Sequence, residues 1–141
     1  MKKLLIISLL ILLGLSACQP ANTVRPVTST PVSAETAIYH NLTAKDLNAM
    51  LANKDFVFIN VHIPFAGNIA GTDLSIPYDE IDQNLSKLPA DKNAKIVLYC
   101  RSGHMSSIAA ETLLKLGYTN IWNLDGGMQA WQQAGFEILS K

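Results

Sequence analysis

The sequence places a thiol, Cys100, at the junction between an apolar segment and a segment with helical periodicity. Residues 96–99 are aliphatic or aromatic, which is typical of a buried strand, whereas apolar residues recur at helical spacing from about Ser106 onward. At such a turn the unpaired N–H groups of the first helical turn and the helix dipole stabilise an anion. A thiolate is one such anion, so Cys100 is a candidate nucleophile.

The residues that follow the thiol suit a loop that binds an anion. Arg101 adds a fixed positive charge, and Gly103 permits the backbone torsions of a tight turn. Free cysteines are also common as small buried apolar residues, and exposed Arg and His side chains are common in loops, so structural interpretations stay open for Cys100, Arg101 and His104. The candidate substrate-binding residues beside the nucleophile are Arg101, Ser102, Gly103, His104, Met105 and Ser106.

The other cysteine, Cys18, follows a segment with the features of an export signal. Lys2 and Lys3 precede an apolar run at 4–15, which is shorter than the roughly 20 residues of a spanning helix. Residues 15–18, Leu-Ser-Ala-Cys, resemble the bacterial lipobox, which implies cleavage before Cys18 and attachment of lipid to it. An ordinary signal peptide that happens to end before a cysteine is the alternative.

The chain divides into three predicted parts. We expect a lipoprotein signal peptide at 1–17, the lipidated cysteine with a Pro-, Thr- and Ser-rich disordered tether at 18–38, and one folded domain, monomeric, at 39–141. The protein is then exported and lipid-anchored to the cell envelope. Gln19 stands where inner-membrane lipoproteins often carry Asp, which favours the outer membrane, facing the periplasm, in a Gram-negative source.

Charge and histidine spacing exclude several classes of partner. The 11 basic and 11 acidic residues balance, and loss of Lys2 and Lys3 with the signal leaves 9 against 11. No basic stripe indicates nucleic acid. The three histidines lack metal-ligand spacing and, once Cys18 is lipidated, Cys100 is without a second free thiol, so we expect no metal site and no cofactor.

The folded part alternates between predicted helices and strands. The predicted helices cover 43–53, 78–85, 106–117 and 127–134, and the predicted strands cover 56–61, 96–99 and 120–124. Such alternation indicates an α/β fold with a mostly parallel central sheet and helices on both faces. Ligands bind at the carboxyl ends of the strands in these folds, and Cys100 stands at such an end.

Four motifs in order carry a resemblance to a known family. They are Asn60-Val61-His62 with Gly67-Asn68-Ile69, Gly71 and Ile76-Pro77; Leu98 to Gly103; Leu116-Gly117-Tyr118; and Leu124-Asp125-Gly126-Gly127 with Ala130-Trp131. Together they resemble the single-domain rhodaneses, a sulfurtransferase family, over about 42–138. The resemblance implies a rhodanese-like fold and a catalytic Cys100. This residue would take sulfane sulfur from thiosulfate or a persulfide and pass it, as a cysteine persulfide, to cyanide, a small thiol or a protein thiol.

The chain departs from the family pattern at Asn60 and His62, and again at His104 and Met105, where many members carry a basic or hydroxyl residue. Two other functions are also open. Asn60 and His62 stand where the family usually carries Asp and Arg, so neutral hydrogen bonds are expected in place of an ion pair. A phosphatase or arsenate reductase on this fold generally needs Arg six positions after the nucleophile, where Ser106 stands. The alternative that we rank second is a non-catalytic rhodanese-like module that binds a partner at the cell envelope.

Overall fold

The computed structural model of the chain describes residues 38–140. The predicted signal peptide, Cys18 and nearly all of the predicted tether lie outside this range. Within 38–140, no helix has the length and apolar character that a membrane span requires.

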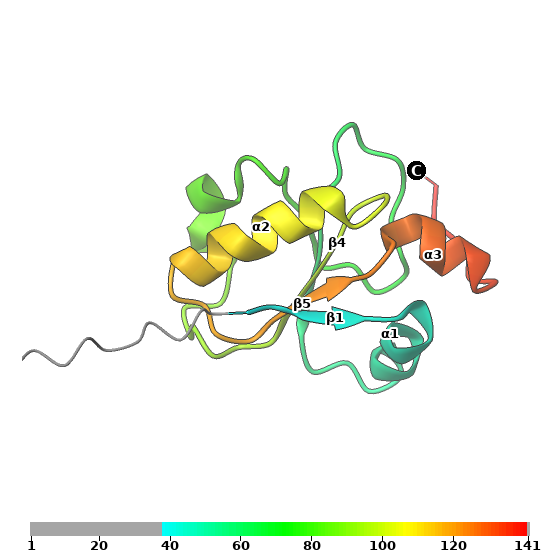
Figure 1. Cartoon of the computed structure of the whole chain (residues 1–141), viewed down its shortest axis with the longest axis horizontal. Coiled ribbons are helices and arrows are strands. Elements are labelled where there is room, and N and C mark those ends of the chain that lie inside the picture. The colour runs from blue at the N-terminus through cyan, green and yellow to red at the C-terminus, as the bar shows by residue number, and fades with distance from the viewer. Residues whose placement is uncertain (1–37, 141) are drawn as a thin grey trace, which may run out of the picture. The chain divides into compact units, whose positions relative to one another are not determined.

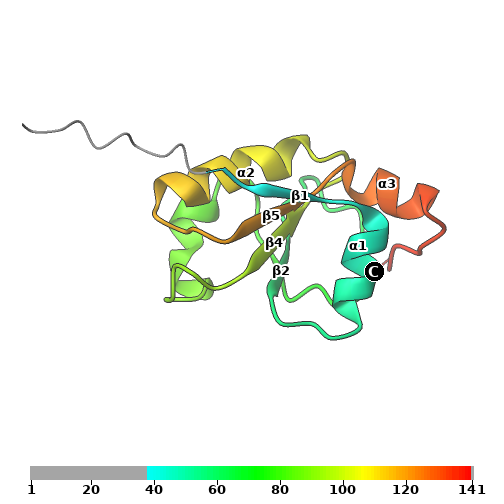
Figure 2. The ribbon, with the colours of Figure 1, turned by 60° about the horizontal axis from the view of Figure 1, so that its bottom comes forward.

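Five parallel strands form one sheet in the order β1-β5-β4-β2-β3 (Figures 1 and 2). The strands are β1 (His40–Leu42), β2 (Val57–Asn60), β3 (Leu74–Ser75), β4 (Ile96–Tyr99) and β5 (Ile121–Leu124). The central strand, β4, agrees with the sequence prediction at both ends. Cys100 therefore directly follows the central strand of the sheet.

Helices cover both faces of the sheet, as predicted. They are α1 (Ala44–Leu51), the 3-10 helix η1 (Ile81–Lys87), α2 (His104–Lys115) and α3 (Gly127–Gln133). Buried residues of α2 and η1 pack in one apolar cluster, and those of α1 and α3 pack in another on the opposite face. In Figures 1 and 2, α2 runs along one side of the sheet and α1 lies near α3 on the other.

The side chains of β4 alternate between these two clusters. Ile96 and Leu98 contact the cluster under α2, and Cys100 continues this alternation on the same face. Val97 and Tyr99 contact the cluster under α1 and α3. A strand buried on both faces explains the uninterrupted apolar run in the sequence. The alternation also directs the thiol toward the helix that begins just after it.

Local signals placed most helices correctly. Thr43 begins α1 with a capping box: its hydroxyl accepts the N–H of Asp46 at 3.2 Å, and the Asp46 carboxylate accepts the N–H of Thr43 at 3.3 Å. Trp131, from the last of the four sequence motifs, is buried, and its indole N–H donates to the carbonyl of Glu137 at 2.9 Å. The helical spacing of apolar residues after Ser106 predicts a buried face that includes Ile108 and Leu116, and this is wrong for both, because Ile108 in α2 and Leu116 just after it are exposed.

Candidate active site

The thiol of Cys100 is buried where β4 meets the amino end of α2. Its residue is 1% exposed, and the backbone N–H of Gly103 donates to Sγ at 3.1 Å. Gly103 precedes the first residue of α2 and has a φ of 93°, a conformation that L side chains rarely adopt. The sulfur therefore lies at a helix amino end whose N–H groups favour an anion, as the sequence predicts.

The hydroxyl of Ser106 is the second donor near the sulfur. Ser106 is fully buried, and its Oγ lies 3.5 Å from the Sγ of Cys100 and 3.1 Å from the carbonyl oxygen of Gly103. A hydroxyl carries one proton, so these two acceptors compete for it. An ionised acceptor forms the stronger hydrogen bond, so a thiolate or persulfide anion at Cys100 favours the bond to sulfur.

The amino end of α3 holds the other side of the loop. The backbone N–H groups of Met128 and Gln129 donate to the carbonyls of Cys100 and Arg101 at 2.9 Å and 3.0 Å. Gly127 has a φ of 57°, and a Cβ on it would lie 2.3 Å from the Cys100 carbonyl oxygen. The sequence shows Gly127 only as part of the last motif and does not reveal these bonds, because backbone groups make them.

The remaining loop residues divide between solvent and core. Arg101, Ser102 and His104 are exposed, whereas Met105 is half-buried against the apolar cluster under α2. In the described part of the chain the ion pairs are Lys54–Asp73 and Lys95–Asp55, and Arg101 belongs to neither. Its guanidinium is therefore available to an anion that approaches from solvent.

Asn60, at the end of β2, replaces an ion pair with neutral hydrogen bonds. Its amide nitrogen donates to the carbonyl of Gly67 and to Oδ1 of Asn68, both at 2.9 Å. Its own Oδ1 accepts the backbone N–H of His62 at 3.0 Å. The neutral bonding expected from the sequence is confirmed for Asn60, and these bonds fasten the loop after β2 beside the thiol loop.

His62 carries a buried nitrogen that no hydrogen bond satisfies. Its Nδ1 has no partner, and the residue is half-buried. Burial lowers the pKa of His62 below its ordinary value of 6.5, and the positive charge of Arg101 lowers it further. His62 is therefore neutral at neutral pH. Sequence reasoning noted the replacement at this position but not this environment.

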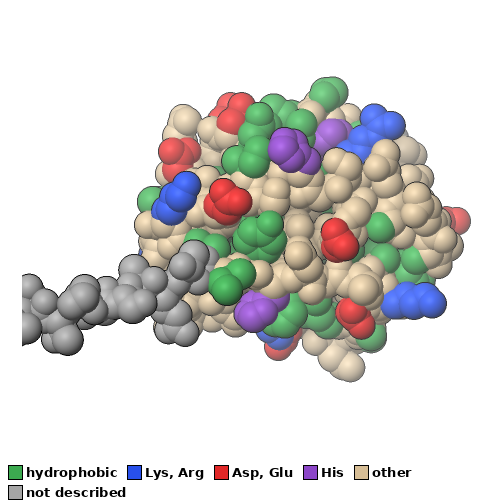
Figure 3. All heavy atoms as spheres, viewed as in Figure 1, with side chains coloured by type: hydrophobic (Ala, Val, Ile, Leu, Met, Phe, Trp, Pro, Cys, Tyr) green, Lys and Arg blue, Asp and Glu red, His purple; other side chains and the backbone are tan. Residues whose placement is uncertain are grey.

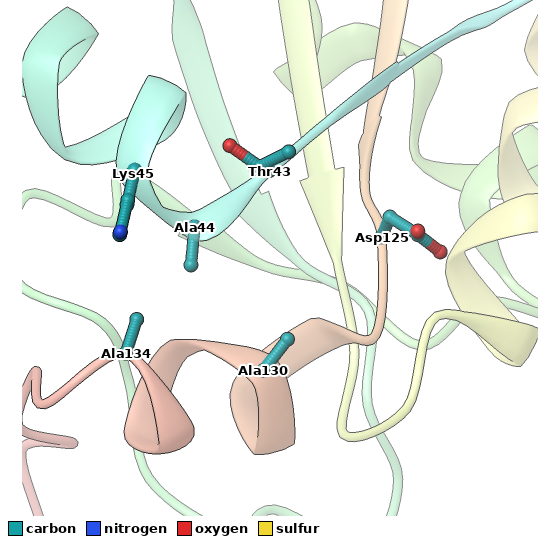
Figure 4. A pocket seen from close by; sticks show the side chains of 6 residues that line it. All are labelled: Thr43, Ala44, Lys45, Asp125, Ala130 and Ala134. Atoms are coloured by element: carbon teal, nitrogen blue, oxygen red, sulfur yellow. The ribbon is translucent and has the colours of Figure 1, made fainter.

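A cavity between α1 and α3 offers little chemistry. It has a volume of about 350 Å³ and none of residues 100–106 lines it. Ala44, Ala130 and Ala134 direct their methyl groups into the space between the helices, whereas Asp125 points away from it (Figure 4).

Residues 38–140 do not contain a group of three or more His, Cys, Asp or Glu side chains arranged to hold a metal ion. On the face in Figure 3, acidic, basic and apolar side chains are interspersed.

Comparison with known proteins agrees with this geometry. Residues 43–134 match the Rhodanese-like domain family. A sulfurtransferase from Allochromatium vinosum is 30% identical over 104 residues, which cover 72% of this chain and 95% of that protein. A tRNA uridine(34) hydroxylase from Escherichia coli is 31% identical over 93 residues, and the match spans 62% of this chain but only 27% of the hydroxylase.

Solved structures share the fold as well. A rhodanese-related protein from Thermoplasma volcanium superposes with a TM-score of 0.62 at 29% identity, over 73% of this chain and all of that one. The parallel sheet, the loop after its central strand and the matched sequence thus all agree. This chain belongs to the rhodanese family.

Proposed function

We propose that this protein is a sulfurtransferase that carries sulfane sulfur as a persulfide on Cys100. The observation that supports this most directly is the convergence of two hydrogen-bond donors, the N–H of Gly103 and the hydroxyl of Ser106, on a buried sulfur at the amino end of α2. Hydrogen-bond donors that the fold holds in place before the reaction stabilise an anion without having to move during it. Both the thiolate and the persulfide that replaces it are anions.

In the first step, the thiolate of Cys100 attacks the outer sulfur of thiosulfate. A bond forms between Sγ and that sulfur, the sulfur–sulfur bond of thiosulfate breaks, and its electron pair leaves with sulfite. Three negative charges enter the step and three leave it, and no oxidant is required. Arg101 is exposed and unpaired among the described residues, so it can attract the anionic donor.

In the second step, an acceptor thiolate or cyanide attacks the outer sulfur of the persulfide. The bond from that sulfur to Sγ breaks, its electron pair returns to Cys100 as thiolate, and the product is an acceptor persulfide or thiocyanate. Because the enzyme is modified between the two steps, ping-pong kinetics are expected.

The position of Ser106 favours sulfur transfer over phosphatase chemistry. A cysteine phosphatase on this fold would use a cation six residues after the nucleophile to bind a tetrahedral oxyanion. Here that position holds a small neutral side chain that is fully buried and bonded to the loop.

The test is the mass of the proteolytic peptide that contains Cys100, from full-length protein in detergent after treatment with thiosulfate. A gain of one sulfur atom that cyanide removes, and that Cys100→Ser lacks, supports the proposal. An unmodified and still alkylatable thiol after both thiosulfate and a low-molecular-weight persulfide would contradict it and favour the non-catalytic binding module.

We also propose that lipid on Cys18 anchors the protein to the cell envelope. The support is the sequence alone: a basic start, an apolar run of signal length and a lipobox-like tetrapeptide. Periplasmic exposure in a Gram-negative source follows from that proposal.

A further inference from the structure

Most lysine side chains gather at one end of the parallel sheet. Residues 38–140 contain six lysines, and five of them lie at the end of the sheet where strands begin, either just before a strand or where a returning helix finishes. These five are Lys54, Lys87, Lys92, Lys95 and Lys115. The sixth, Lys45, lies in the first turn of α1, at the opposite end, where β1 has finished.

Ion pairs neutralise two of the five lysines. Lys54 lies 2.6 Å from the carboxylate of Asp73, and Lys95 lies 2.9 Å from that of Asp55. Asp91 is the third acidic residue at this end, so the five lysines outnumber the acidic residues there. Three lysines have no acidic partner within salt-bridge distance among the described residues: Lys87, Lys92 and Lys115. The uncompensated charge at this end is therefore positive.

Contacts between two turns hold these three lysines at one surface. The Nζ of Lys92 lies 3.7 Å from the centroid of the Tyr118 ring, and the Tyr118 hydroxyl donates to the carbonyl of Pro89 at 3.0 Å. The turn after η1 is thus fastened to the turn after α2. Lys87 ends η1 and Lys115 ends α2, so both exposed side chains lie where these turns meet.

Two exposed apolar side chains border the lysines. Ile38, which is 74% exposed, comes just before β1, and Leu116, which is 37% exposed, directly follows α2. His40 pairs with Trp122, and continuing this register places Ile38 opposite Asn120, between α2 and β5. In Figures 1 and 2 the start of β1 lies beside the carboxyl end of α2. We name this set the basal surface: Ile38, Lys87, Lys92, Lys115 and Leu116.

The composition of the basal surface suits a bilayer with anionic headgroups. Such headgroups attract lysines, and exposed apolar side chains insert among them. The proposed lipid on Cys18 precedes Ile38 by 20 positions, so the anchored chain enters the domain at this surface. We propose that the basal surface docks on a membrane that carries anionic lipid headgroups. This inference rests on the proposed lipid anchor and adds both the surface that meets the bilayer and the lipid class that it binds.

The anchor makes weak docking sufficient. A flexible chain of the length of the predicted tether has an end-to-end distance of about 25 Å, so the domain stays close to the bilayer. Docking is then an intramolecular step, favoured by an effective concentration in about the millimolar range. Each lysine near an anionic surface strengthens binding about fivefold, so three unpaired lysines favour the docked state.

Acylation of individual lysines on vesicle-bound protein tests the inference. Full-length lipidated protein is added to preformed vesicles of phosphatidylcholine, with or without phosphatidylglycerol, and treated with a water-soluble N-hydroxysuccinimide ester. Mass spectrometry gives the acylation rate at each lysine. We expect the rates at Lys87 and Lys115 to fall about fivefold or more when phosphatidylglycerol is present, and the rate at exposed Lys45 to change by less than about twofold. Equal rates in the two kinds of vesicle would overturn the inference.

A matched pair of charge reversals locates the contact. Lys115→Glu places a negative charge on the basal surface, and Lys45→Glu makes the same change on an exposed residue at the opposite end. The protection of Lys87 by phosphatidylglycerol should be lost in Lys115→Glu, because an attraction becomes a repulsion, and should stay within about twofold of wild type in Lys45→Glu. High salt should also remove the protection in wild type. An equal effect of the two variants would contradict the inference.

Vesicle flotation and the mass of the peptide that contains Cys18 separate this inference from the proposed anchor. If Cys18 carries lipid and the protein floats with both kinds of vesicle, equal acylation rates at Lys87 defeat only the docking. If Cys18 carries no lipid and the protein does not float, the anchor and the inference are defeated together.

Discussion

The buried sulfur of Cys100 receives hydrogen bonds from one backbone donor and one side-chain donor, and only the second can be removed by substitution. Ser106→Ala deletes the hydroxyl 3.5 Å from Sγ and leaves the N–H of Gly103 in place. A hydrogen bond to a charged group contributes about 1.5–3 kcal/mol, so we expect kcat/KM for thiosulfate to fall by about tenfold to a hundredfold.

Ser107→Ala is the control for this loss. Ser107 also lies in the first turn of α2, but its hydroxyl donates to the carbonyl of His104 at 2.7 Å and does not contact sulfur. Activity of Ser107→Ala should stay near that of wild type. If the two variants lost activity equally, the effect would belong to the helix and not to a bond with sulfur.

His62 gives the stability of the folded domain a dependence on pH. Its pKa is lowered in the folded state, chiefly by burial, from an ordinary value of 6.5. As the pH falls through 6.5, the unfolded chain binds a proton before the folded chain does, so the free energy of unfolding decreases.

His62→Gln should remove this part of the pH dependence. Urea denaturation between pH 8 and pH 5 measures it, and wild type should lose more stability over that range than the variant. Parallel losses in the two proteins would show that other groups cause the dependence.

At the level of single residues, the sequence predicted the position of the Cys100 thiol better than its surroundings. Cys100, Gly103 and Ser106 could be predicted because a strand end, a glycine and a helix start lie within seven positions. The environment of His62 could not be predicted, since it depends on Arg101, which is 39 positions away and approaches only because β2 and β4 are paired.

Among the elements, α3 determines the position of the thiol loop through its first residue. Gly127→Ala combines a left-handed backbone conformation with a Cβ 2.3 Å from the Cys100 carbonyl oxygen. The left-handed backbone conformation costs about 1–2 kcal/mol and the close contact of the Cβ costs about 1–3 kcal/mol. We therefore expect the free energy of unfolding to fall by about 2–5 kcal/mol and sulfur transfer to be lost.

Gly135→Ala provides the matched comparison. Gly135 also has a positive φ, of 90°, but an added Cβ meets nothing within 4 Å. Chemical denaturation should therefore show only the backbone cost of about 1–2 kcal/mol, with sulfur transfer retained. Equal destabilisation of the two variants would mean that the contact with the thiol loop contributes nothing.

The shortest strands and the 3-10 helix could not be predicted correctly from the sequence. The strands β1 and β3 have three and two residues, too few for an alternating pattern, and their pairing with β5 and β2 defines them. The short helix predicted at 78–85 is a 3-10 helix at Ile81–Lys87, interrupted by a non-helical Asn84. Longer elements such as α2 carry enough periodicity to be predicted, apart from their first residues.

For the molecule as a whole, the proposed lipid anchor predicts where the protein is found in the cell. Cys18→Ser should abolish labelling with palmitate, because the lipid is attached to this residue, and should leave the predicted signal uncleaved, so the mass of the polypeptide rises by that of residues 1–17. Cys100→Ser should remain in the membrane fraction. Palmitate labelling of Cys18→Ser at the wild-type level would contradict the anchor.

Contacts between distant parts of the chain also escaped prediction. The bridge from Asn68 to Leu139 joins residues 71 positions apart, and Ile138, next to the bridge, lines a cavity together with Arg101. Neither partner has a local pattern that marks it, so only the folded structure reveals that the C-terminal segment lies near Arg101.

The parallel sheet has a further consequence for an anchored protein. All five described strands run in one direction, so Ile38, the first described residue, lies just before β1 at the end of the sheet where strands begin, whereas Cys100 lies at the end where they finish. The four residues of β4 alone span about 13 Å between these ends. If the proposed lipid anchor acts through the chain before Ile38, the proposed sulfur transfer would take place at the end of the sheet opposite the first described residue.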